Sequence, residues 1–231
     1  MRWISLAALV LLVSVVGLFA LTPASAQSTE PSPVEGKVIC IDPGHGGDET
    51  GAVYHKRGSP ESRWTLEEKE INLDVAKALR GLLVRDGATV VMTRKTDKDV
   101  SLADRVNICN GKAADITVSV HTNSTYSPRW DGSLTLVAKD DDWPLAKVIR
   151  PIMYEGLKEN WEGLFTDYGI REDVWYIPLN TTMPAVILEP VFMSNHDEAV
   201  ALRQEAGIDG SRRAQIVQVA YDGIVAYFEA N

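Results

Sequence analysis

Short apolar runs of strand-like sequence precede three polar residues, His45, His121 and Glu189. Because sites in open α/β sheets lie beyond the carboxyl ends of the strands, we expect these side chains to share one edge of a sheet. Imidazole is the commonest metal ligand, and zinc held by two imidazoles and one oxygen keeps a fourth position for water. The pattern therefore predicts a catalytic zinc site. The ordinary alternatives are an incidental histidine in a glycine-rich turn and a hydrogen-bonded structural histidine.

The carboxylate ligand of such a site has to come from another segment. Glu67, Glu68 and Glu70 stand together at the start of an expected helix and offer three candidates. Acidic residues in a first turn also interact favourably with the helix dipole, which explains such a cluster without any metal. Spacing alone leaves the choice among the three open.

The hydrophobic pattern alternates between strands and helices. It predicts strands at 37–41, 89–93, 114–120, 132–138 and 185–188. It predicts helices at 66–85, 101–111, 143–163 and 211–230. We therefore expect an α/β fold: a single domain with a mostly parallel, twisted sheet, helices on both faces, and the zinc site at the carboxyl ends of the strands.

The N-terminus has the features of a secretory signal peptide. Arg2 precedes a long apolar run, and Ala24 and Ala26 form the small-x-small pattern of a cleavage site. An uncleaved membrane anchor is the alternative, because the apolar run is long for a signal. We expect export to the periplasm or to the extracellular cell wall. The expected organisation is a signal peptide at 1–26, a linker at 27–36 and a folded domain at 37–231.

The charge balance is acidic. Without the signal peptide, 22 Lys and Arg face 32 Asp and Glu, so the net charge is −10. Such a protein is an unlikely general binder of nucleic acid or anionic lipid. We expect no nucleic-acid partner, no stable membrane span after signal cleavage, and a monomer.

Two cysteines, Cys40 and Cys109, are too few for a disulfide framework. Cys40 lies in a predicted strand and Cys109 in a predicted helix. An exported protein could pair them, but we expect two separate buried thiols that behave as small hydrophobes.

Four ordered segments resemble the motifs of a known enzyme family, the zinc-dependent N-acetylmuramoyl-L-alanine amidases with a type 3 catalytic domain. The resemblance covers about residues 37–228, and its strength comes from the order and separation of the motifs. The four segments are Asp42–Gly47, Glu68–Leu73, Ser119–Asn123 and Leu188–Asn195. Shorter matches are Thr93-Arg94 with Asp97, Leu102–Val106 and Met183–Ala185.

This resemblance implies a role for each residue of the site. It makes Glu68 the carboxylate ligand of Zn²⁺, beside His45 and His121, and it makes Glu189 the catalytic acid/base. It also implies that peptidoglycan is the substrate, cleaved at the amide between the lactyl group of N-acetylmuramic acid and the L-alanine of the stem peptide.

Some residues depart from the family pattern or stay outside it. Thr122 stands where alanine is usual, and Pro190 stands where threonine or a small residue is common; neither change removes a reactive group. Arg105 could contact a substrate carboxylate, but we expect a helix-surface arginine paired with a nearby acid. We expect the remaining histidines, His55 and His196, on the surface.

Two other functions compete with the amidase. A zinc peptidase acting on cell-wall peptides would use the same attack geometry at an amide carbonyl, so the sequence separates it poorly. A catalytically inactive cell-wall binding module would not need both histidines, Glu68 and Glu189, and their presence argues against it.

Overall fold

The computed structural model of the protein describes residues 31–56, 63–159, 161 and 163–231. The predicted signal peptide lies outside these residues. The end of the predicted linker belongs to the fold, because Val34 is fully buried in the core and the Gly36 N–H donates a hydrogen bond to the Gly87 carbonyl over 3.0 Å. Within the described ranges, no helix has the length and apolar character needed to cross a membrane.

The described residues form a six-stranded sheet with the order β4-β1-β5-β8-β6-β7. β4, β1, β5 and β8 are mutually parallel, whereas β6 is antiparallel to β8 and carries β7 parallel to itself. The predicted mostly parallel sheet is confirmed, with a reversed pair at one edge. The strands are β1 (Val38–Pro43), β4 (Thr89–Met92), β5 (Ile116–Val120), β6 (Gly132–Val137), β7 (Thr166–Glu172) and β8 (Ala185–Glu189).

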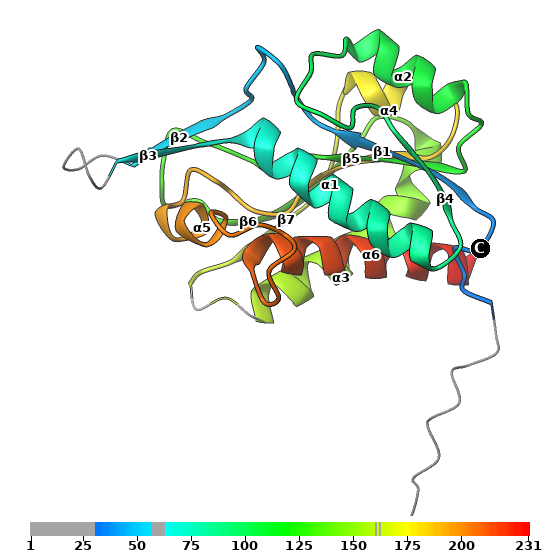
Figure 1. Ribbon diagram of the computed structural model, residues 1–231. Coiled ribbons are helices and arrows are strands. Elements are labelled where there is room, and N and C mark those ends of the chain that lie inside the picture. The colour runs from blue at the N-terminus through cyan, green and yellow to red at the C-terminus, as the bar shows by residue number, and fades with distance from the viewer. Residues whose placement is uncertain (1–30, 57–62, 160, 162) are drawn as a thin grey trace, which may run out of the picture. The chain divides into compact units, whose positions relative to one another are not determined.

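Helices cover both faces of this sheet, as predicted. Figure 1 shows α2 and α4 on one side and α3 and α6 on the other, and α1 packs against α6. The longer helices are α1 (Glu68–Arg85), α2 (Leu102–Asn110), α3 (Trp143–Glu159) and α6 (Arg212–Ala230). The shorter ones are α4 (Tyr176–Asn180), α5 (His196–Ala201) and a 3₁₀ turn η2 (Asp140–Asp142).

A small antiparallel hairpin, β2 (Val53–Lys56) and β3 (Trp64–Glu67), was not predicted. It projects from the domain and runs directly into α1 (Figure 1). Because α1 begins at Glu68, the hairpin sets the position of that glutamate relative to the sheet.

The core explains why these elements form. The central strands β1 and β5 bury nearly every residue, which is the pattern of strands covered on both faces. Along α1, Ile71, Val75, Leu79 and Leu83 recur at a spacing of four, and each is at most 1% exposed. Fully burying one such side chain contributes about 1.5–3 kcal/mol, so this single stripe holds α1 firmly on the sheet.

Cys40 and Cys109 form a disulfide, with their Cα atoms 5.5 Å apart. The expectation of two separate thiols is therefore wrong. Both residues were placed in the correct elements, a strand and a helix. What the sequence did not reveal is that α2 packs against the sheet so that residues separated by 69 positions come into contact.

Candidate metal centre

Three neighbouring strands end at the same level of the sheet. Pro43 of β1 is in register with Val120 of β5, and Val120 is in register with Leu188 of β8. His121 and Glu189 follow directly, and His45 follows two residues after Pro43. The parallel strands therefore deliver these side chains to one edge, where we expected them.

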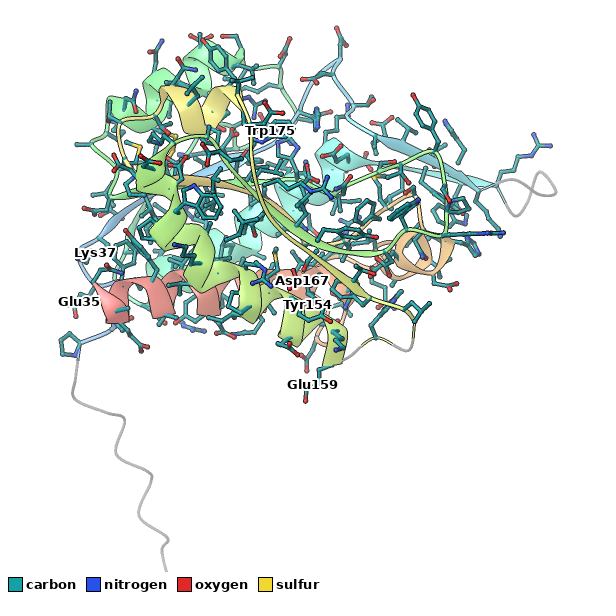
Figure 2. All side chains as sticks on the ribbon, turned by 180° about the vertical axis from the view of Figure 1, so that it is seen from behind. Glu35, Lys37, Tyr154, Glu159, Asp167 and Trp175 are labelled. Atoms are coloured by element: carbon teal, nitrogen blue, oxygen red, sulfur yellow. A yellow bond between two sulfur atoms is a disulfide. The ribbon has the colours of Figure 1, made fainter. Side chains whose placement is uncertain are left out.

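A cavity of about 320 Å³ opens at this edge. His45, Glu68, His121 and Glu189 all line it. Trp175, from the segment between β7 and α4, lines it too and is labelled in Figure 2. Sequence reasoning gave no indication of this tryptophan, because nothing in its neighbourhood distinguishes it from a core residue.

The ligand atoms of His45, Glu68 and His121 lie within 4.8 Å of one another. His121 Nδ1 is 2.9 Å and His45 Nε2 is 3.2 Å from the same oxygen, Glu68 Oε1. Donors bound at 2.0–2.1 Å to a tetrahedral zinc ion are about 3.3 Å apart. The donor set and its spacing therefore fit a zinc ion, and the three residues form a possible metal-binding site.

The structure also distinguishes among the three glutamates that the sequence left open. Glu68 is 5% exposed and points into the cavity. Glu67 pairs instead with Lys69, over 3.4 Å, and Glu70 is exposed to solvent. Only Glu68 of this cluster can reach both histidines.

Hydrogen bonds fix the Glu68 carboxylate in place. Its Oε2 accepts from the Ala52 N–H at 2.9 Å, and its Oε1 accepts from the Thr122 N–H and from Asn72 Nδ2, each at 3.2 Å. Burial alone would raise the pKa of Glu68, but the hydrogen bonds with His121 and His45 outweigh it and hold that pKa well below its usual range. The group is thus an ionised, oriented carboxylate.

His45 is oriented by a second carboxylate. Its Nδ1–H donates to Glu49 Oε1 over 2.8 Å, which leaves Nε2 facing the cavity. Burial lowers the pKa of His45, but Glu68 and Glu49 together raise it above its usual value. A carboxylate on the far nitrogen of a ligand histidine is a common means of fixing ring orientation and tautomer. Glu49 was not predicted, although an acid four residues after a candidate ligand histidine was a usable signal.

His121 has an unusually close backbone neighbour. A Cβ atom at Gly44 would lie 2.2 Å from the His121 ring, so only glycine fits there. The rings of His121 and His45 meet edge to face with their centroids 4.9 Å apart. The glycine that precedes His45 therefore allows the two imidazoles to converge.

We call the segment Asp42–Gly47 the His45 loop. Arg94, which is 1% exposed, donates from Nε to the Pro43 carbonyl at 2.9 Å and from Nη2 to the Gly44 carbonyl at 2.8 Å. Its Nη2 also reaches the Lys69 carbonyl of α1 at 2.7 Å. One buried guanidinium thus ties the His45 loop to the helix that carries Glu68.

Arg105 holds the same loop through further hydrogen bonds. It donates to the Pro43 and His45 carbonyls, each at 2.6 Å, and pairs with Asp42 at 2.8 Å. The expected pairing with an acid is confirmed, but the expected surface position is wrong, because Arg105 is only 3% exposed. Its role is to position the loop, and it does not face the cavity.

Glu189 lies at the end of β8 and lines the cavity without joining the metal-ligand cluster. Burial raises its pKa above the usual value, and the nearby charge of Glu68 adds to this, while His121 and a hydrogen bond with Asn123 oppose it. A carboxyl group with a raised pKa beside a reaction centre is suited to accept and return a proton. The other histidines, His55 and His196, are exposed, as expected.

Comparison with known proteins agrees with this geometry. The sequence model of the family described as N-acetylmuramoyl-L-alanine amidase matches residues 39–225. The chain belongs to this amidase family. The family resemblance first noted in the sequence motifs is therefore confirmed, and the α/β domain with its cavity is an amidase-family domain.

One relative is the N-acetylmuramoyl-L-alanine amidase LytC of Bacillus subtilis (strain 168), which is 32% identical to this chain over 201 residues. The matched region covers 85% of this chain but only 36% of LytC, so the chain spans about a third of the length of that relative. The germination-specific N-acetylmuramoyl-L-alanine amidase of the same strain is 30% identical over 212 residues, with 85% of this chain and 81% of that protein covered. The solved catalytic domain of CwlV, an amidase from Bacillus (Paenibacillus) polymyxa var. colistinus, has a TM-score of 0.71 and 31% identity, covering 84% of this chain and 99% of that one.

Proposed function

We propose that this protein is a zinc-dependent N-acetylmuramoyl-L-alanine amidase that cleaves peptidoglycan between the lactyl group of N-acetylmuramic acid and the L-alanine of the stem peptide. The observation that carries the proposal is the meeting of His45, Glu68, His121 and Glu189 in one cavity of an amidase-family fold. The names of LytC and of the germination-specific amidase support the choice of substrate.

His45 Nε2, Glu68 Oε1 and His121 Nδ1 would hold the zinc ion, because two imidazoles and one carboxylate are a typical ligand set of catalytic zinc. Zn²⁺ in such a site supplies Lewis acidity, which makes water a nucleophile at neutral pH. In this role Glu68 Oε2 would keep its hydrogen bond from the Ala52 N–H, so the backbone would hold the carboxylate while Oε1 binds the metal.

Glu189 is the proton carrier of the proposed reaction. Its carboxylate accepts a proton from water as the water oxygen adds to the carbonyl carbon of the scissile amide. The same carboxyl group then passes that proton to the alanine nitrogen as the carbon–nitrogen bond breaks, so the products are a lactyl carboxylic acid and a free amine. Its raised pKa matches this double role, because the group has to hold the proton between the two steps.

We also propose that residues 1–26 are a signal peptide cleaved after Ala26. Residues 37–231 then form the catalytic domain, preceded by a short linker. The protein acts in the periplasm or cell wall as a monomer. The Cys40–Cys109 disulfide supports export, because disulfides persist in oxidising compartments and are rare in the cytosol.

Digestion of purified sacculi with the zinc-loaded protein tests the proposal. We expect stem peptides with a new N-terminal L-alanine. Cleavage inside the peptide would instead identify a zinc peptidase, and binding without release would identify a wall-binding module.

Two variants test the assigned roles. Glu189→Gln should keep one zinc per chain, measured by elemental analysis, but lose about 10²- to 10⁴-fold in turnover. His121→Ala should lose the zinc itself, whereas Glu70→Gln, an exposed neighbour of Glu68, is the matched control that keeps both metal and activity. Loss of zinc from the Glu189 variant would contradict its role as proton carrier.

A further inference from the structure

The cavity reaches β6 of the reversed edge pair, where Leu136 lines it. Leu136 of β6 pairs with Ile187 of β8 on one side and with Arg171 of β7 on the other. Paired residues of neighbouring strands place their side chains on the same face. Because Leu136 and Ile187 both line the cavity, Arg171 extends the same surface one strand farther from the metal site.

Arg171 differs from the other cations near the cavity. Lys69 is paired with Asp97 at 2.9 Å, and Arg94 and Arg105 are buried against loop carbonyls. Arg171 is exposed, and among the residues that the structure describes its guanidinium has no hydrogen-bonding partner and no ion pair within contact distance. Its charge nevertheless reaches the cavity, because it opposes the rise in the pKa of Glu189.

The distance to the reaction centre suits the second residue of a stem peptide. Strands lie about 4.8 Å apart, so β7 is about 10 Å from β8 and its Glu189. One peptide residue spans at most about 3.6 Å, which puts the α-carboxyl of the residue after L-alanine about 7 Å from the scissile carbonyl. An arginine side chain on β7 can cover the remaining gap.

A cation there would attract an anionic substrate. Glu49, Glu68 and Glu189 surround the reaction centre, and the protein is acidic overall. Even with the two positive charges of the proposed zinc ion, these three carboxylates leave the site without net attraction for a second-residue carboxylate, which a guanidinium would supply. Arginine is well suited because its planar guanidinium binds a carboxylate through two parallel hydrogen bonds.

We propose that Arg171 binds the α-carboxylate of the second stem-peptide residue, which is free where that residue is joined to the third through its side-chain carboxyl. This contact makes the enzyme selective for stem peptides in which that α-carboxylate is not amidated. This proposal rests on the proposed amidase function. It assigns to Arg171 the contact that the sequence suggested for Arg105, which is buried against Asp42 and faces away from the substrate.

Two soluble muropeptides that differ only at that carboxyl group test the proposal: a disaccharide tripeptide with a free α-carboxyl at the second residue, and the same compound with a carboxamide. We expect the wild-type enzyme to prefer the free acid by about tenfold in kcat/KM. Arg171→Gln should lose that preference by becoming about tenfold slower on the acid alone, with its zinc content unchanged. Arg171→Lys should retain part of the preference, because it keeps the charge but not the paired donors.

Arg80→Gln is the matched control, since Arg80 is exposed on α1, twelve residues or about 18 Å along the helix from Glu68. Equal wild-type rates on the two substrates, or an equal loss on both in Arg171→Gln, would overturn the carboxylate contact. Failure of the wild-type enzyme to cleave either substrate would instead refute the amidase function, so the two failures are distinguishable.

Discussion

The disulfide between Cys40 and Cys109 should contribute several kcal/mol to the stability of the domain. It closes a loop between residues 69 positions apart, and the chain-entropy estimate for such a loop is about 4 kcal/mol. In a domain of this size each kcal/mol shifts the melting temperature by about 2–4 °C, so reduction should lower it by about 8–16 °C. Circular dichroism melts of the oxidised protein and of the protein with a phosphine reductant measure the difference.

Reduction of the disulfide should lower the stability of the domain without weakening zinc binding. Cys109 and Arg105 lie on α2, so the disulfide helps keep Arg105 against the His45 loop. Arg94 holds that loop independently, and we therefore expect the reduced protein to bind zinc normally well below its melting temperature. The Cys40→Ala/Cys109→Ala double variant should melt close to the reduced wild type. A melting temperature that moves by less than about 2 °C on reduction would refute the entropic reasoning, and two titratable thiols in the denatured, unreduced protein would refute the disulfide itself.

Two further perturbations test the electrostatics. Burial raises the pKa of Asp131 to about 6, and burial together with the charge of Asp131 raises that of Glu198 to about 7, despite the ion pair of Glu198 with Arg212. Both folded-state pKa values lie above those of the unfolded chain, so the stabilisation from protonating these two carboxyl groups is complete below about pH 4 and is lost as the pH rises through 6 and 7. In denaturant unfolding, the free energy of unfolding should fall over this range by about 2–3 kcal/mol less in Asp131→Asn than in the wild type. Identical pH profiles of the two proteins would contradict this. Glu49→Gln should weaken zinc binding about 10- to 100-fold by removing the charged acceptor of His45 Nδ1, as measured by competition with a chelator; unchanged affinity would show that this contact does not tune the metal.

The sequence predicted those parts of the fold that bury continuous apolar surface. The strands β1 and β5 and the helix α1 were found because their buried faces leave a clear periodicity. β7 was missed because it lies at the edge of the sheet with only β6 beside it, and its exposed ends and its glycine, Gly169, weaken the strand pattern. The β2–β3 hairpin was missed because it lies outside the main sheet and only one of its residues, Leu66, is buried.

In the site, the sequence predicted those residues whose positions depend only on where the strands end. A general rule about parallel sheets located His45, His121 and Glu189, because all three depend only on where strands end. The choice of Glu68 depends on the rotation of the first turn of α1, which is set by the hairpin before it and is invisible in the spacing of the glutamates. Arg105 was misplaced because an arginine is read as a surface residue unless the backbone carbonyls that bury it are known.

The arginine contacts also explain why the family motifs include residues that cannot bind a metal. His45 has a backbone φ of 61°, in the left-handed region that residues other than glycine rarely adopt. Arg94 and Arg105 draw the carbonyls of the His45 loop inward, and Thr93 and Arg105 both bind the Asp42 carboxylate at the start of that loop. With its carbonyl held on the protein side, His45 has to present its imidazole to the cavity. A chain that kept the three proposed ligands but lost these buried contacts would leave the loop free to relax to an ordinary backbone conformation, and the proposed metal site would lose one of its two imidazoles.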